Sequence, residues 1–113
     1  MEKPERKWEG EIIPPAQWGR DHNSTLLYIE TRAVDYSGKL DPRHLRGGDQ
    51  YPTRLKDALL AGHTDFHCID DFEAEGLMEN IGTGINPVCK LTTKGWETVS
   101  NLRRAKAERT LKR

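Results

Sequence analysis

The stretch from His63 to Leu102 limits the fold of this chain most, because several local structural signals follow one another there in a fixed order. Its first part predicts a helix over residues 64–75, with Thr64 as a good cap. Apolar residues recur three apart along one side of that helix, at Phe66, Ile69 and Phe72. Gly76 follows directly, where a glycine commonly ends a helix.

A hairpin and another helix are predicted next. Segments 77–81 and 88–91 mix apolar and polar residues and flank a loop of Gly, Asn and Pro, which is typical of two strands joined by a long turn. Thr92 can cap the following helix, whose apolar stripe is formed by Trp96, Val99 and Leu102. The predicted order is helix, glycine, strand, loop, strand and helix. This is the order of elements in the second half of a winged helix.

Residues 53–102 resemble winged helix-turn-helix regulators of the PadR and MarR kind. The family pattern of two apolar residues three apart, an acid and Gly-Leu-apolar is matched by Ile69, Phe72, Glu73, Gly76, Leu77 and Met78. The Leu-Thr-x-x-Gly that follows the family's wing is matched by Leu91, Thr92, Lys94 and Gly95. The resemblance implies an α+β, mainly helical fold with three helices, a two-stranded wing and a C-terminal helix. It also implies a transcription-associated regulator that dimerises through its terminal helix.

Two earlier helices complete the predicted fold. Asp21, Asn23 and Ser24 offer caps for a first helix with an apolar side from Leu26 to Val34, which ends at Ser37-Gly38. Residues 53–61 have a capping Thr53 and an apolar face, closed by Gly62, and are predicted to be the second helix of a helix-turn-helix.

The predicted organisation is a polar N-terminal arm at 1–20, a winged-helix domain at 21–102 and a basic C-terminal helix extension at 103–113. The 113 residues suit a single small domain. The arm is highly charged, and its side chains suited to docking are Trp8, Ile12 and Ile13.

The sequence predicts a cytoplasmic protein without a membrane partner, because no apolar run resembles a signal peptide or could span a bilayer. Cys68 and Cys89 show no CxxC spacing and lie beside apolar residues, which predicts packing roles. The formal net charge is +0, but residues 91–113 carry seven Lys or Arg against two Asp or Glu.

Duplex DNA is the partner that the family resemblance implies. The predicted recognition helix opposes the usual contact, because it carries acids and no Lys or Arg, whereas cations supply most of the attraction to phosphate. DNA contact is expected to be weak, salt-dependent and made by residues outside its acidic side. The candidates are Arg54, Lys56, Thr64, His67, Asn80, Lys90, Arg103, Arg104 and Lys106.

A non-enzymatic protein interaction module is the alternative. In this interpretation the wing and the acidic third helix meet a basic protein surface, since complementary charge speeds and orients association. The acidic candidates are Asp70, Asp71, Glu73 and Glu75.

No catalytic residue, cofactor or metal site is predicted. His63 and His67 lie four apart with Asp70 or Asp71 one turn later, a spacing that metal sites use, but capping or solvated histidines are the favoured interpretation. Cys68 points roughly 100° away from His67 and does not improve the set. The glycines at 82–84 lack the lysine and following helix of a phosphate-binding loop.

Residues 39–52 contain two prolines and a Gly47-Gly48 pair, and are predicted to form a loop. Arg43, His44 and Arg46 make a small basic patch within it. Two interpretations stay open for this patch, a solvated loop or a contact with an anion or phosphate.

Overall fold

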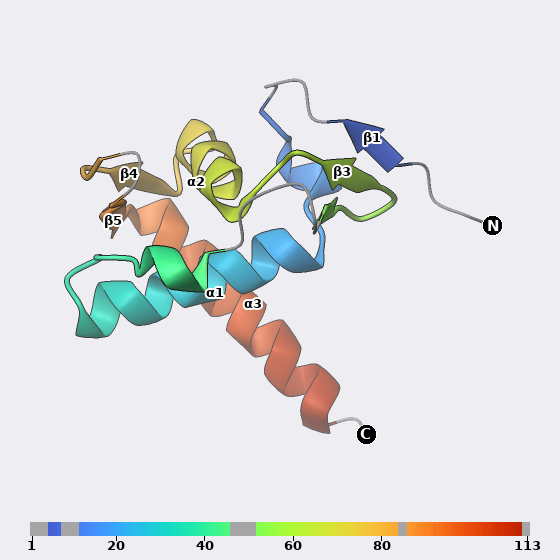
Figure 1. Ribbon diagram of the computed structural model, residues 1–113. Helices are drawn as coiled ribbons and strands as arrows, with labels where there is room; N and C mark the ends of the chain where they lie inside the picture. The colour runs from blue at the N-terminus through green and yellow to red at the C-terminus, as the bar shows by residue number, and fades with distance from the viewer. Residues whose placement is uncertain (1–4, 8–11, 46–51, 84–85, 112–113) are drawn as a thin grey trace.

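The computed structural model describes residues 5–7, 12–45, 52–83 and 86–111, and Figure 1 shows its elements. The α-helices are α1 (Arg20–Asp35), α2 (Asp65–Ala74) and α3 (Thr93–Leu111), and short 3-10 turns are η1 (Pro15–Gln17) and η2 (Pro42–His44). The strands are β1 (Glu5–Lys7), β2 (Thr53–Arg54), β3 (Leu59–Ala61), β4 (Met78–Asn80) and β5 (Cys89–Leu91). The coarse prediction of an α+β chain is confirmed.

Helix α1 confirms that a first helix lies here, but the predicted caps are wrong, because the helix begins at Arg20 after Gly19. The predicted apolar side is also wrong at Val34, which is 65% exposed. The inner side of α1 buries Leu26 and Ile29, as the apolar periodicity predicts, and also buries the polar residues Asp21 and His22. The chain leaves the helix through Gly38, which has a φ of 86° that favours glycine. A Cβ at Gly38 would collide with the backbone of β5, so this glycine lets the chain turn back closely against that strand.

The segment 53–61 is where the fold prediction is wrong. It forms the antiparallel hairpin β2–β3, with Thr53 opposite Leu60, instead of the second helix of a helix-turn-helix. Strand β3 also pairs in parallel with β1, which lies near the N-terminus. In addition, the Asp21 carboxylate accepts a hydrogen bond from the Arg54 backbone N–H at 2.6 Å. These long-range contacts satisfy the backbone as strands and override a weak local helical pattern.

Helix α2 and the hairpin β4–β5 confirm the helix predicted over residues 64–75 and the strand pair predicted from segments 77–81 and 88–91. Gly76 follows α2 with a φ of 80°, as expected of a helix-ending glycine. The two strands are antiparallel, with Met78 opposite Leu91. Lys39 forms an isolated antiparallel bridge with Val88, so the segment after α1 also lies against this hairpin. Positions 84 and 85 of the predicted wing tip lie outside the described residues.

The main core lies between α1, α2, the β4–β5 hairpin and the start of α3. Its largest fully buried apolar side chains are Leu26, Ile29, Ile69, Phe72, Leu77 and Val99. Cys68 and Cys89 are both buried, as the predicted packing roles require. Trp96 is 41% exposed, so the predicted apolar stripe of the last helix is wrong at this position. Gly95 takes the buried place instead, because its missing side chain allows close contact with the Leu77 backbone.

The N-terminal segment docks through Ile13, which is buried with Leu55 and Leu60 in a second small cluster. Trp18 packs against both clusters, and its Nε1–H donates to the Ile13 carbonyl at 2.9 Å. Ile12, also predicted to dock, is 50% exposed, and position 8 lies outside the described residues.

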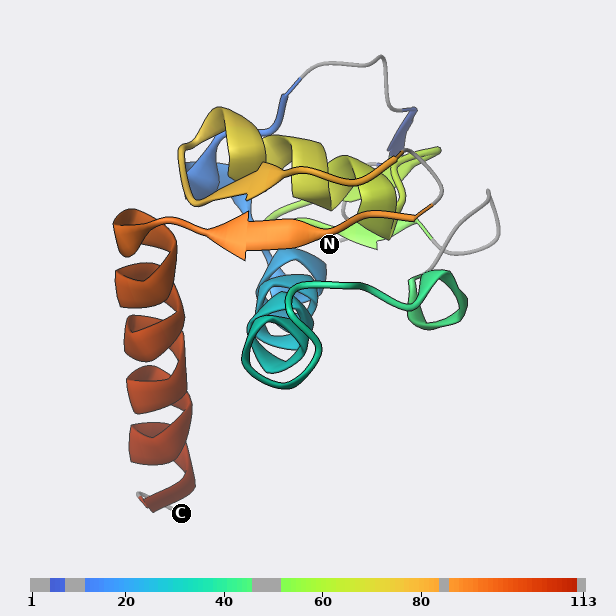
Figure 2. The ribbon, with the colours of Figure 1, turned by 90° about the vertical axis from the view of Figure 1, so that its left-hand side faces the viewer.

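Helix α3 begins beside the β4–β5 hairpin, and its second half extends away from the rest of the molecule (Figure 2). The predicted cap is confirmed, since the Thr92 hydroxyl oxygen accepts a hydrogen bond from the Gly95 N–H at 3.1 Å. An ion pair between Arg103 and Glu30 ties the middle of α3 to α1. Among the described residues, none of the helices combines the length and the apolar character needed to cross a membrane.

Candidate functional site

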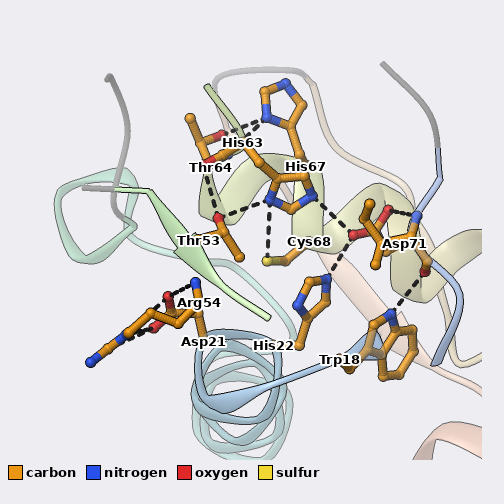
Figure 3. A network of polar contacts seen from close by, with 11 residues as sticks. Trp18, Asp21, His22, Thr53, Arg54, His63, Thr64, His67, Cys68 and Asp71 are labelled. Atoms are coloured by element: carbon orange, nitrogen blue, oxygen red, sulfur yellow. Dashed lines mark hydrogen bonds and ion pairs between the residues drawn. The ribbon is translucent and has the colours of Figure 1, made fainter. Parts of the chain in front are cut away.

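Polar side chains from α1, α2 and the segment before α2 meet inside the protein (Figure 3). The Asp71 carboxylate lies at the centre, with its Oδ2 2.7 Å from Nε2 of His22 and 3.0 Å from Nε2 of His63. Its Oδ1 accepts a hydrogen bond from the Ile13 backbone N–H at 2.9 Å. Asp71 is 2% exposed and both histidines are 0% exposed. The contacts therefore compensate for burying a carboxylate and join three parts of the chain.

The electrostatics of this centre favour an ionised Asp71. Burial by itself would raise the pKa of the Asp71 carboxyl, but the hydrogen bonds from His22, His63 and the Ile13 amide outweigh burial and lower the pKa below its ordinary value. A buried carboxylate needs a positive charge nearby, which a protonated imidazole or a cation can supply.

The other ring nitrogen of His63, Nδ1, also has polar neighbours. It lies 2.9 Å from the Thr53 hydroxyl oxygen, and that hydroxyl lies 2.8 Å from the His63 carbonyl oxygen, to which it can donate. Cys68 Sγ lies 4.0 Å from the same Nδ1. We call His22, His63, Cys68 and Asp71 the His–Asp–Cys cluster.

His22 is held differently, by aromatic packing. Its ring stacks on Trp18 with the centroids 5.4 Å apart and the planes 5° apart, and it meets the edge of Phe72. Its Nδ1 has no hydrogen-bond partner among the described residues, so the polar contact of this ring is made at the cluster.

Sequence reasoning considered His63, Cys68 and Asp71 but missed His22. It grouped His63 with His67, whereas His67 forms a capping box with Thr64, whose backbone N–H donates to Nδ1 of His67 at 2.9 Å. The capping interpretation is thus confirmed for His67 and wrong for the buried His63. A signal for His22 did exist, because it lies four residues before Leu26 on the apolar stripe of α1, where a polar residue indicates a buried partner.

The predicted DNA contacts do not form one surface. Arg54 pairs with the buried Asp21 at 2.7 Å and Arg103 pairs with Glu30, so both cations are neutralised locally. The Asn80 side-chain oxygen accepts backbone hydrogen bonds within its own hairpin. The remaining candidate cations are exposed, at Lys56, Lys90, Arg104 and Lys106. They belong to the β2–β3 turn, β5 and the second half of α3, and Figure 1 shows that β3 lies apart from β5 and that α3 extends away from both.

The acidic side of α2 is smaller than the sequence predicts. Asp71 is buried in the cluster, so its predicted role as a surface contact for a protein is wrong. Asp70 and Glu73 are exposed, and Glu75 pairs with Lys94 at 3.1 Å. Every third or fourth residue of an amphipathic helix faces inward, and composition alone does not reveal which acids do so.

In the described part of the 39–52 loop, an arginine is paired with an aspartate of the same loop. Arg43 forms an ion pair with Asp41 at 2.9 Å, and the hydrogen bonds from the Arg43 side chain and backbone lower the pKa of Asp41 from 3.8 to about 2. Arg46 of the predicted basic patch lies outside the described residues. Local neutralisation of Arg43 favours the solvated loop over an anion contact.

The side of α3 that faces away from α1 is uncovered in the described structure. A shallow depression runs along it, lined by Thr93, Trp96, Glu97, Ser100, Asn101 and Arg104. The combination of an exposed tryptophan with charges of both signs is typical of a protein contact surface.

No protein-family model, curated protein or solved structure matches this chain. The structure itself defines an α+β chain in which helix α2, hairpin strand β5 and helix α3 contact α1, and α3 extends away from the other elements. Its distinctive features are the buried His–Asp–Cys cluster and the uncovered side of α3.

Proposed function

We propose that this chain is a regulatory domain of the winged-helix type that acts as a homodimer joined through α3 and contacts duplex DNA weakly. The observation that carries the proposal is the order of α1, the Lys39–Val88 bridge, α2, the β4–β5 hairpin and α3. The PadR and MarR resemblance implies the order α1, α2, hairpin and α3, while the Lys39–Val88 bridge adds a contact that it does not predict. The chain departs from that expectation between η2 and α2, where the hairpin β2–β3 stands in place of a helix.

DNA contact is best supported through exposed cations outside α2. Asp70 and Glu73 on the exposed side of α2 would face phosphate unfavourably. Lys90 on β5 and Lys106 on α3 are exposed and available for phosphate contact. Because few cations take part, affinity is low and falls as salt rises.

Replacing Lys90 and Lys106 by alanine is expected to weaken binding to random-sequence duplex about tenfold at low salt, since each lost phosphate contact reduces the salt slope by about 0.9. Fluorescence anisotropy over a salt series measures both quantities. Lys94→Ala is the matched control, because Lys94 already pairs with Glu75. Failure of the unmodified protein to bind any duplex at low salt contradicts the DNA-binding part of the proposal.

The uncovered side of α3 supports the homodimer because its charge pattern is self-complementary. If two α3 helices cross antiparallel at the point between Ser100 and Asn101, Glu97 of each copy faces Arg104 of the other. The half-exposed Trp96 then faces Ala105. A two-fold interface repeats every such contact twice, and tryptophan contributes strongly to interface energy.

Charge reversal tests this arrangement. Glu97→Arg or Arg104→Glu alone places like charges together at two symmetric contacts, and is expected to weaken dimerisation at least about tenfold. The double variant restores the opposite charges and most of the affinity. Sedimentation equilibrium measures the dissociation constant, and Glu79→Arg on β4 is a control away from α3. Equal dimerisation by all the variants is incompatible with the proposed pairing.

A further inference from the structure

The His–Asp–Cys cluster combines four kinds of evidence for a metal centre: ligand chemistry, proximity, burial and supporting contacts. The possible ligand atoms of His22, His63, Cys68 and Asp71 all lie within 4.8 Å of one another, and each of these residues is buried. We propose that these four side chains bind one zinc ion. The inference is independent of the proposed DNA contact and dimer.

The ligand types fit zinc better than calcium or magnesium. Imidazole, thiolate and carboxylate all bind zinc, in tetrahedral sites with bond lengths of about 2.0 to 2.3 Å. Calcium and magnesium prefer oxygen ligands in greater number, and the cluster contributes one carboxylate. At those bond lengths, the ligand atoms of a tetrahedral site lie roughly 3.3 to 3.8 Å apart. To bind zinc, the Asp71 oxygen and the two histidine nitrogens must therefore move slightly apart by side-chain rotation, and Cys68 Sγ must move toward them.

Charge balance supports a divalent cation in this dry environment. A Cys68 thiolate and the Asp71 carboxylate together carry two negative charges, and two neutral imidazoles add none. Binding zinc therefore displaces the thiol proton of Cys68 and the protons that the ligating ring nitrogens carry, and leaves a neutral site. An unbalanced ion could not be buried this completely without a large desolvation cost.

Neighbouring groups hold the ligands in place. The Ile13 N–H binds the Asp71 oxygen that faces away from the histidines, at 2.9 Å. With Nε2 of His63 on zinc, its Nδ1–H can donate to the Thr53 hydroxyl, which in turn can donate to the His63 carbonyl. Such outer contacts orient metal-binding histidines. For His22, stacking on Trp18 fixes the ring, while coordination leaves an Nδ1 proton without an acceptor among the described residues.

The alternative is a metal-free cluster in which two histidines share protons with Asp71. The two states differ at Cys68, because only metal coordination requires its thiolate. The chain provides a matched control in Cys89, a cysteine 1% exposed that does not belong to the cluster.

The experiment uses the full chain, freed of metal by a chelator and then titrated with zinc and with cobalt. We expect one zinc per chain, a melting temperature higher by more than about 5 °C at a free zinc concentration 100 times the dissociation constant, and a thiolate-to-cobalt charge-transfer band. Cys68→Ser should lose that band and bind zinc at least about 100-fold more weakly, whereas Cys89→Ser should retain both properties. His67→Gln should also retain them, because His67 caps α2.

Three results would overturn the inference. The first is that the unmodified protein binds less than about 0.1 zinc per chain and shows no thermal shift. The second is that the cobalt band survives in Cys68→Ser. The third is that the cobalt band is lost in a folded Cys89→Ser. The first and third results decide the question even if Cys68→Ser does not fold.

Discussion

Gly95→Ala is expected to destabilise the folded chain by about 3 kcal/mol or more, because a methyl group has no space at this position. A Cβ there would fall onto the Leu77 carbonyl oxygen and also press on the Leu91 side chain. A backbone carbonyl cannot rotate aside as a side chain can. Helix α3 must therefore move away from the hairpin, which opens the contact around Val99. Urea unfolding followed by tryptophan fluorescence measures the loss.

Gly76→Ala is the matched control for this substitution. It makes the same chemical change, and a Cβ at Gly76 meets nothing within 4 Å. Its cost comes from the positive φ of 80° alone, and is expected to be about 1 to 2 kcal/mol. If Gly95→Ala were no more destabilising than Gly76→Ala, the close packing of α3 on the Leu77 backbone would be wrong.

Asp71→Asn is expected to lower the free energy of unfolding by about 3 kcal/mol, because it removes the charge that both buried histidines contact. Asparagine has nearly the same shape, but its amide presents N–H groups where the carboxylate accepted hydrogen bonds. His22 could respond by moving its proton to Nδ1, which has no acceptor among the described residues. The variant therefore leaves at least one buried polar group unsatisfied.

Asp70→Asn provides the comparison, since Asp70 is the neighbouring and exposed acid of α2. Its effect on stability should stay within about 0.5 kcal/mol, as for most surface substitutions. The free energy of unfolding of both variants is measured in the presence of a chelator. The measurement then reports on the hydrogen-bonded cluster without metal. Similar stabilities of the two variants would mean that Asp71 does not join α1 to α2 as described.

Much of the second half of the fold could be predicted because its signals are local. Thr64 and Gly76 mark the ends of α2, and Thr92 marks the start of α3. Each signal depends on hydrogen bonds or backbone angles within a few residues. The antiparallel pairing of segments 77–81 and 88–91 follows equally from a short connection between two strands.

The segment 53–61 could not be predicted in the same way, because its structure depends on distant partners. Its apolar spacing is compatible with a short helix, but β3 pairs with β1 and Arg54 is held by Asp21. These contacts span much of the chain, and a single sequence does not show which segments meet. Propensity over nine residues is too weak to oppose them.

The His–Asp–Cys cluster was only partly visible for a related reason. His63, Cys68 and Asp71 lie close in the sequence, whereas His22 comes from α1 and is separated from Asp71 by 49 residues. Helical geometry correctly indicated that Cys68 and His67 face different directions. It gave no information about a ligand from another helix, so His22 could not be added to the set.

The antiparallel pairing of two α3 helices is tested most directly by disulfide cross-linking. Ser100 lies beside the proposed two-fold axis, so Ser100→Cys brings two thiols within disulfide range, whereas Thr110→Cys places them far apart. The natural cysteines are buried and should not react. The proposal predicts a covalent dimer under mild oxidation for Ser100→Cys, whereas Thr110→Cys should dimerise without forming a covalent link. A Ser100→Cys protein that stays monomeric, or equal cross-linking at both positions, would contradict it.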